Sequence, residues 1–379
     1  MACVLKERTS TDKGVIVLTS NDIKLAVKME NENLILNLRN SYIIGLHYNW
    51  FPVDVKPPAF VDFIFCPSHE LRAEINKEQK VFEYTAQNFV PTIFENKGNE
   101  ERSWDFIILA RDVEFKNNYF ALDTIRAYID TFSVIPKVLF LMPKPKLSTI
   151  EKLRNFIFKL INPGIHSLFS KSHIKTITHG VSKYFEHTFT QEERKGIKLI
   201  DSDTNYPFMF EREDLSLFLK HSKVYLHFSK SESRGRNISY ALVAGAIVVG
   251  FEQLEDSIPM ELTRGGYFFK ALNDLDFIHV MKKAISNIRG EPVQDSAFNH
   301  FRESVNVPRL INFCIENFKL SNENWNTSNL DIRIAWNLQS RDINGLDTTF
   351  ESFIKKILNR NIDSGYLYSY LNSGYPEEL

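Results

Sequence analysis

One stretch in the second half of the chain, Lys223 to Phe251, constrains the fold most strongly. It opens with an apolar run, Val224 to Phe228, passes through a polar loop rich in Ser and Arg, and continues with small and apolar residues at helical spacing from Ile238 to Ala244. Gly245 separates this predicted helix from a second apolar run, Ala246 to Phe251. Strand, loop, helix, glycine and strand in this order indicate a βαβ unit within a parallel sheet.

The loop of this unit, Ser229 to Asn237, is the first place where we expect functional residues. In open parallel sheets, ligands bind beyond the carboxyl ends of the strands, where a loop leads into the N-terminus of the next helix. Backbone N–H groups at a helix N-terminus favour anionic groups such as phosphate. The polar side chains of this loop are therefore candidate ligand contacts.

A second alternating pattern follows a polar, charged segment, Glu95 to Ser103, which is the predicted linker. Trp104 to Ala110 is a predicted strand, Arg111 to Asn117 a loop, and Tyr119 to Phe132 a helix. Further strands are predicted at Val138 to Met142, Ile174 to Thr178 and Ile197 to Ile200, and further helices over residues 148 to 169 and near Val181 to Phe189. Strands that alternate with helices predict a doubly wound parallel sheet.

The first 98 residues contain short apolar runs separated by turns. Strands are predicted at Gly14 to Thr19, Leu34 to Leu38, Tyr42 to His47 and Val61 to Cys66, each apolar enough to be buried on both faces. We expect residues 1–98 to form one lobe, residues 99–320 a second, and residues 321–379 a helical tail that packs back on the lobes.

Composition excludes several classes of protein. The 379 residues suffice for two domains, and the net charge of -1 gives no general attraction to nucleic acid. The three cysteines, Cys3, Cys66 and Cys314, lack metal-ligand spacing and argue against a disulfide scaffold. There is no signal peptide pattern and no long apolar run, so we expect a cytoplasmic protein. Peripheral contact with a membrane, through the Tyr-rich tail, is an alternative.

Two motifs resemble those of a known family. Ser229, Glu232, Gly235, Ala241 and Gly245 fall at the spacing of the signature S-x-x-E-G-x-G-x-x-x-x-E-A-x-A-x-G. This signature, with its E-x7-E core, resembles that of the large retaining family of GT-B glycosyltransferases.

The second motif lies upstream, where Arg111 and Lys116 match the family's G-R-x-x-x-x-K loop, with Ala110 in place of the glycine. The resemblance covers roughly residues 60 to 255 and implies an α/β fold of two Rossmann-like, GT-B-like lobes with parallel sheets and a helical C-terminal tail. The N-terminal lobe would then lie on the acceptor side, and the second lobe would bind a nucleotide sugar.

The resemblance also implies roles for individual residues. Arg111 and Lys116 would hold the donor diphosphate, because paired cations balance its charge without a metal. Glu232 would accept hydrogen bonds from the sugar hydroxyls, and Gly235 would let the backbone approach the donor. The family often places a histidine facing the donor sugar, where His47 ends a predicted strand. The remaining candidate donor contacts in the loop are Ser229, Arg234, Arg236 and Asn237.

Some of these residues also have a structural interpretation. Glu232 can cap its helix, His47 can be a structural residue at a strand end, and Arg234 and Arg236 can be solvated. The signature's second glutamate, which usually holds the ribose, is Tyr240 here. A tyrosine has one hydroxyl where a carboxylate accepts two hydrogen bonds, so Tyr240 is either a residue of the donor cleft or a core aromatic.

The sequence thus predicts a glycosyltransferase that moves a sugar from a nucleotide-activated donor to a glycan or glycolipid acceptor, as in cell-surface polysaccharide biosynthesis. Retention of configuration is implied by the resemblance alone, and no metal is expected. A catalytically inactive protein that binds a nucleotide sugar or a glycan is an alternative that Tyr240 favours. A nucleotide-sugar epimerase or a phosphorylase on the same fold is a further alternative.

Overall fold

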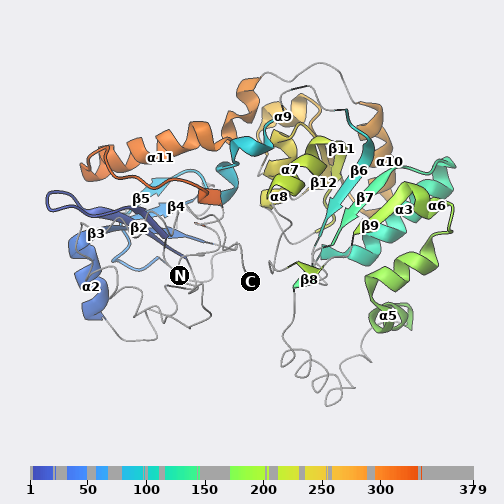
Figure 1. Ribbon diagram of the computed structural model, residues 1–379, viewed down its shortest axis with the longest axis horizontal. Helices are drawn as coiled ribbons and strands as arrows, with labels where there is room; N and C mark the ends of the chain where they lie inside the picture. The colour runs from blue at the N-terminus through green and yellow to red at the C-terminus, as the bar shows by residue number, and fades with distance from the viewer. Residues whose placement is uncertain are drawn as a thin grey trace, which may run out of the picture. The chain divides into compact units, whose positions relative to one another are not determined.

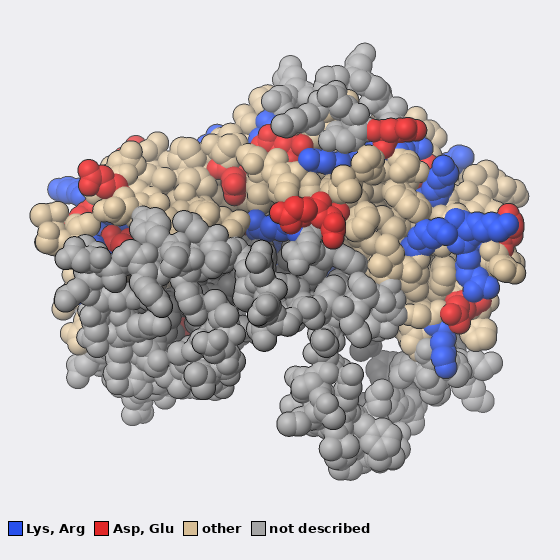
Figure 2. All heavy atoms as spheres, viewed as in Figure 1, with Lys and Arg blue, Asp and Glu red and all other residues tan. Residues whose placement is uncertain are grey.

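The computed structural model describes residues 3–19, 22, 32–48, 57–66, 79–96, 98, 101–110, 116–142, 144–145, 171–200, 203–204, 212–229, 235–252, 254, 258–287, 295–331 and 334. The chain divides into two compact units, shown in Figure 1. Unit 1 comprises Met1–Thr92 and Asn299–Leu379, and unit 2 comprises Ile93–Phe298. Both signs of charge occur among the described residues on the face in Figure 2.

Unit 1 is built on a five-stranded sheet of order β1-β2-β3-β4-β5. The strands are β1 Cys3–Lys6, β2 Gly14–Thr19, β3 Tyr42–His47, β4 Phe63–Phe65 and β5 Lys80–Phe82. β1 pairs antiparallel with β2, and the other pairs are parallel. Helix α2 is Glu32–Ser41, helix α11 is Glu303–Phe318, and 3-10 turns cover Ala86–Asn88 and Thr92–Phe94.

Each face of this sheet has its own core. Ile35 and Leu38 of α2 pack on one face with Ile16 and Ile44, and α11 covers the other face with Leu310 and Cys314. Cover on both faces explains why β2, β3 and β4 are buried throughout rather than at alternate residues. Three of the predicted strands, at β2, β3 and β4, are confirmed.

The predicted strand at Leu34 to Leu38 is wrong, because these residues lie in α2. Ile35 and Leu38 are three residues apart and are both buried, which is helical spacing. A short apolar run such as Leu34 to Leu38 does not distinguish a strand from a buried helix, and the helix continues through polar residues to Ser41.

Residues 299–320 belong to unit 1, although we expected them in the second lobe. Leu310 and Cys314 of α11 are fully buried in the unit 1 core, and Asn306 Nδ2 donates to the carbonyl oxygen of Asn88 at 2.6 Å. The chain returns here because α11 covers a sheet face that would otherwise be exposed. Of the expected tail, residues 332, 333 and 335–379 lie outside the described part of the chain.

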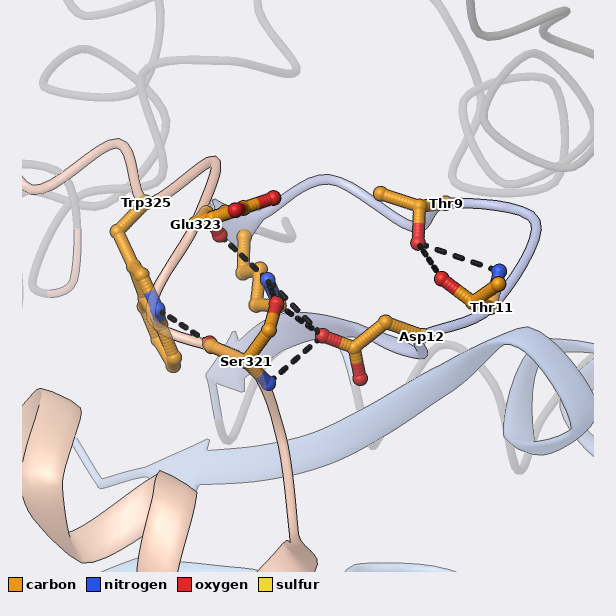
Figure 3. Close-up of polar contacts among 7 residues, drawn as sticks. Thr9, Thr11, Asp12, Ser321, Glu323 and Trp325 are labelled. Carbon is orange, nitrogen blue, oxygen red and sulfur yellow. Dashed lines mark hydrogen bonds and ion pairs between the residues drawn. The ribbon is translucent and has the colours of Figure 1, made fainter.

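The segment after α11 is anchored to β1 by a buried lysine (Figure 3). The side chain of Lys6 is fully buried, and its ammonium lies 3.2 Å from Asp12 Oδ2 and 3.0 Å from Ser321 Oγ. It also donates to the carbonyl oxygen of Glu323 and lies 5.5 Å from the ring centre of Trp325. A charge buried this deeply is tolerated only when it is paired and hydrogen-bonded.

Unit 2 contains a six-stranded parallel sheet of order β13-β12-β11-β6-β7-β9. Its strands are β6 Trp104–Leu109, β7 Val138–Leu141, β9 Ile197–Ile200, β11 Ser222–Leu226, β12 Ile247–Phe251 and β13 Phe268–Ala271. Its helices are α3 Asn118–Phe132, α5 Lys171–Thr188, α6 Glu193–Gly196, α7 Arg212–Lys220, α8 Arg236–Val243, α9 Met260–Arg264 and α10 Asp274–Ser286. β8 Lys144–Pro145 pairs with β10 Asp203–Thr204, and a 3-10 segment, Asp295–His300, follows.

The order of the strands reverses at the centre of this sheet. From β6 the chain proceeds outward through β7 and β9 on one side, then returns to β11 on the other side and proceeds through β12 to β13. Adjacent parallel strands whose connections run in opposite directions leave a crevice at their carboxyl ends, the topological switch point. In unit 2 this point lies between β6 and β11.

The predicted strands at β6, β7, β9, β11 and β12 are confirmed, as is the helix at α3. The predicted strand at Ile174 to Thr178 is wrong, because it lies in α5, which is kinked at Gly180 (φ 70°). Ile174, Ile177 and Val181 also fit helical spacing, so the apolar pattern was ambiguous there. Residues 148–169 lie outside the described part. No helix among the described residues has the length and apolarity needed to cross a membrane.

Candidate functional site

The candidate site lies at the carboxyl ends of β6 and β11, two strands that pair directly. β6 leads through a loop to Lys116 and into α3, and β11 leads through the loop after Phe228 into α8. The two loops selected from the sequence therefore begin on neighbouring strands, on either side of the switch point. This is the edge of a doubly wound sheet at which ligands bind.

Asn117 joins the two loops. Its side-chain amide donates a hydrogen bond to the carbonyl oxygen of Phe228 at 2.8 Å. Asn117 has left-handed backbone angles (φ 54°, ψ 41°) at the N-cap of α3. Asparagine adopts this conformation more readily than most residues, so it suits both the turn and the contact. The bond keeps the start of α3 next to the end of β11.

A buried polar pair lies beneath these loops. Tyr225 and His227 are 1% and 5% exposed, and the Tyr225 hydroxyl lies 3.3 Å from His227 Nδ1. The side chain of Asn237, in the first turn of α8, hydrogen-bonds to the Tyr225 hydroxyl. The backbone N–H of His227 donates to Val249 O of β12 at 2.9 Å. These contacts connect β11 and β12 with α8.

His227 is held neutral by its surroundings. Burial lowers the pKa of its imidazole from 6.5 to about 3, and the nearby positive charge of Lys116 acts in the same direction. Burial also raises the pKa of Tyr225. Both side chains therefore remain uncharged near neutral pH and act only through hydrogen bonds. His227 was not among the residues predicted from the sequence, where its signal is a histidine that interrupts the apolar run from Val224 to Phe228.

Ser229 follows this strand and is 1% exposed. Within the described part of the chain, its hydroxyl has no hydrogen-bond partner. A buried hydroxyl without a partner costs free energy, and such groups are few in folded proteins. The Ser229 side chain is thus available to a ligand or to residues 230–234 of the loop, which lie outside the described part.

The N-terminus of α8 completes the site. Gly235 is its N-cap, with extended backbone angles (φ -75°, ψ 124°), and no side chain caps this end of the helix among the described residues. Arg236 and Asn237 follow and are half-buried. The first N–H groups of a helix and its dipole together favour an anion.

The candidate residues are thus partly placed. The bond from Asn117 to Phe228 brings their chain neighbours, Lys116 and Ser229, to one edge of the sheet. The contact of Asn237 with Tyr225 brings the start of α8, with Gly235 and Arg236, to the same edge. The predictions for Arg111, Glu232 and Arg234 concern residues outside the described part.

His47 lies in unit 1, at the end of β3, and is 4% exposed. Its Nε2 accepts a hydrogen bond from the backbone N–H of Ala86 at 3.2 Å. Its ring packs edge-on against Phe65, with 5.7 Å between the ring centres. These contacts match the structural interpretation of this histidine.

Tyr240 is fully buried within unit 2. Its ring stacks on Phe94, with 4.3 Å between the ring centres and 8° between the planes. Ile238, Ala241 and Leu242 of the same helix are also buried. Of the two interpretations that the sequence left open, the position of Tyr240 fits a core aromatic.

Comparison with solved structures identifies the fold. A UDP-forming α,α-trehalose-phosphate synthase from Burkholderia xenovorans is similar with a TM-score of 0.50 and 12% sequence identity, over 79% of this chain and 72% of that chain. The fold is GT-B. HepE from Anabaena, solved in complex with UDP, has a TM-score of 0.48 and 11% identity over 80% of this chain and 79% of its own.

The pneumococcal O-GlcNAc transferase GtfA, in complex with UDP and GlcNAc, has a TM-score of 0.45 and 11% identity over 76% of this chain. This chain spans 55% of the length of GtfA and 49% of the length of TarM from S. aureus. No known family profile and no curated protein matches the sequence.

Proposed function

We propose that this protein is a glycosyltransferase that binds a nucleotide-activated sugar at the carboxyl ends of β6 and β11. The hydrogen bond from Asn117 to Phe228 carries the proposal, because it joins the two loops at the switch point. One of these loops brings Lys116, and the other leads to the N-terminus of α8. A lysine on one loop and a helix N-terminus at the end of the other are together suited to a diphosphate.

The leaving group decides what such a site must do. Transfer from a nucleotide sugar releases a nucleoside diphosphate, whose developing charge must be neutralised. Lys116 and the first N–H groups of α8 would do this together with Arg111. By the family resemblance, Glu232 would bind the sugar hydroxyls. Ser229, Arg234 and Arg236 lie in the same loop and would line the donor site. The trehalose-phosphate synthase of similar fold is UDP-forming, which makes UDP the first nucleotide to test.

Several finer features belong to the same proposal. The acceptor is a glycan or glycolipid, the transfer retains the configuration of the sugar, and no resident metal takes part. The product serves the biosynthesis of a cell-surface polysaccharide in the cytoplasm, with peripheral contact to a membrane where the acceptor is a lipid.

A second candidate function is binding without turnover. It is favoured by Tyr240, which is buried against Phe94 at the position of the signature's second glutamate. The helix therefore offers no carboxylate to a ribose at that position. A protein of this kind would bind the nucleotide sugar but would not transfer the sugar to an acceptor.

Turnover distinguishes the two functions. The purified protein is incubated with UDP-, GDP-, ADP-, TDP- and CDP-sugars and a panel of glycan and glycolipid acceptors, and products are detected by mass spectrometry. A glycosylated acceptor, formed with stoichiometric release of nucleoside diphosphate, supports the transferase. Tight binding of one donor without product across all acceptors favours the binding protein.

A further inference from the structure

Tyr225 and His227 are polar residues in a part of the sheet where apolar residues would be expected. They lie two residues apart at the end of β11 and therefore share one face of the sheet. The other face, which includes Val224, Leu226 and Phe228, is packed in an apolar core. The aromatic residue and the histidine contact each other through polar atoms, at 3.3 Å between the hydroxyl and Nδ1.

One direction of hydrogen bonding through the pair starts from the amide of Asn237. The Asn237 side chain hydrogen-bonds to the Tyr225 hydroxyl, and only its amide nitrogen can donate. When that nitrogen donates to the phenol oxygen, the single hydroxyl hydrogen of Tyr225 is directed to His227 Nδ1. A neutral imidazole that accepts at Nδ1 carries its proton on Nε2. In this direction the network holds His227 as the Nε2–H tautomer, which the experiments below test.

The two ends of this network belong to the two loops of the site. Asn237 lies in the first turn of α8, and Asn117, the neighbour of Lys116, donates to the carbonyl oxygen of Phe228, the neighbour of His227, at 2.8 Å. Gly250 of β12 leaves room for Leu254, because a Cβ there would lie 2.3 Å from Leu254 Cδ1, and it would be in ordinary contact, at 3.7 Å, with His227 Cβ. The histidine is therefore enclosed by sheet, helix and loop.

We propose that Tyr225 and His227 are positioning residues, which set the first turn of α8 and Lys116 at the spacing that a nucleoside diphosphate requires. The inference rests on the proposed function, since it assigns the diphosphate to this edge. The pair acts through Asn237 and Lys116. Side chains on a strand hold such a geometry better than side chains on a loop. A neutral imidazole also places a polar group near the lysine without repelling its charge.

The first test is Tyr225→Phe, which removes the hydroxyl and keeps the ring. We expect it to weaken the binding of UDP, or of whichever diphosphate the wild type selects, by about tenfold, which corresponds to about 1.4 kcal/mol. Tyr128→Phe is the matched control. Tyr128 is a buried tyrosine of the same unit, ten residues along α3 from Asn118 and so about 15 Å from its first turn. It should leave nucleotide affinity unchanged.

Histidine variants separate positioning from packing. In His227→Asn, the side-chain oxygen can replace Nδ1 as the acceptor for Tyr225, whereas His227→Phe keeps a ring without an acceptor. We expect the asparagine variant to retain more nucleotide affinity than the phenylalanine variant. In the double variant with Tyr225→Phe and His227→Phe, the losses should be less than additive, because both changes break the same bond. Equal affinities of the two single histidine variants would overturn the inference.

NMR of the ligand-free protein decides the inference even if the proposed function fails. Histidine-selective 15N labelling should show His227 as the Nε2–H tautomer, with its resonance assigned by its loss in His227→Asn. The amide chemical shifts of Lys116 and Asn237 should change in Tyr225→Phe. They should stay as in the wild type in Tyr128→Phe. A wild type that binds no nucleotide but shows these shifts refutes the proposed function and supports the positioning. An Nδ1–H tautomer, or unchanged shifts at Lys116 and Asn237, overturns the positioning even if nucleotide binds.

Discussion

The amide of Asn117 and the carbonyl oxygen of Phe228 lie 2.8 Å apart and join loops from the two central strands of unit 2. The donor follows β6 and the acceptor follows β11, where the order of the strands reverses. The side chain comes from a residue in the left-handed conformation, which only a few residue types adopt easily. One asparagine thus determines both a backbone turn and the distance between the loops.

Asn117→Ala should therefore destabilise the protein and weaken nucleotide binding. The variant loses one hydrogen bond and places an alanine in the left-handed region. Together these changes should lower the free energy of unfolding by about 2 kcal/mol. Asn117→Gly restores the backbone freedom but not the bond, so it should recover part of the stability and none of the affinity. Chemical denaturation and calorimetric titration measure the two effects. An alanine variant with the stability and affinity of the wild type would refute this role.

Tyr240→Glu tests the position of Tyr240. The residue is fully buried and stacked on Phe94, so a carboxylate there would be desolvated. We expect a loss of at least about 3 kcal/mol in the free energy of unfolding, or failure to fold. Tyr240→Phe keeps the stacked ring and should be much closer to the wild type. A stable Tyr240→Glu variant with increased nucleotide affinity would instead place the residue in the donor cleft.

The strands β6, β7, β11 and β12 of unit 2 could be predicted because they are mostly buried and read as apolar runs, whereas the edge strand β13, which contains the exposed Lys270, was not predicted. The same reasoning failed at Leu34 to Leu38 and at Ile174 to Thr178, where an apolar run belongs to a helix. Length and tertiary packing decide such cases, and a local pattern contains neither. The return of α11 to unit 1 was also hidden, because an amphipathic helix does not specify which sheet it covers.

The contact between Lys6 and Asp12 gives a test of unit 1. Asp12→Asn leaves a fully buried ammonium without its counter-charge, and we expect a loss of about 3 kcal/mol. Adding Lys6→Met removes the unpaired charge and should restore much of this loss. The exposed pair of Lys195 and Glu192 supplies the control, since Glu192→Gln should leave the denaturation midpoint unchanged. An Asp12→Asn variant as stable as the wild type would show that Lys6 does not need the carboxylate.

His227 should make stability depend on pH. The pKa of His227 is about 3 in the folded protein, and its ordinary value of 6.5 applies to the unfolded chain. Between pH 3 and pH 6.5, His227 therefore binds a proton in the unfolded chain but not in the folded protein. The free energy of unfolding therefore falls as pH decreases through this window. In His227→Asn the fall between pH 7 and pH 5 should be smaller by about 2 kcal/mol.

The control for this pH effect is His279→Asn on α10, which changes an exposed histidine in the same way. Denaturation of all three proteins at both pH values gives the comparison. Identical pH dependence in the wild type and His227→Asn would show that His227 is already protonated, or equally accessible to protons, in the fold.

The candidate site was predicted in part. Two loops with recognisable spacing indicated one edge of the sheet, because Lys116 and Ser229 to Asn237 follow neighbouring strands. The buried pair of Tyr225 and His227 could not be predicted, since a strand residue shows its partners only after the register with β12 and the position of α8 are known. Tyr240 stands at the position of the signature's second glutamate, yet its burial depends on Phe94, which is distant in sequence.

The central claim is that the carboxyl ends of β6 and β11 bind a nucleoside diphosphate. Calorimetric titration of the wild type and of Lys116→Ala with UDP, GDP, ADP, TDP and CDP tests it most directly, with Lys223→Ala as a control. Lys223 pairs with Asp105 at 2.7 Å near the start of β11, at the opposite end of the strand. The account predicts selective binding of one diphosphate, lost in Lys116→Ala and kept in Lys223→Ala. Binding unaffected by Lys116→Ala, or no binding to the wild type, would contradict it.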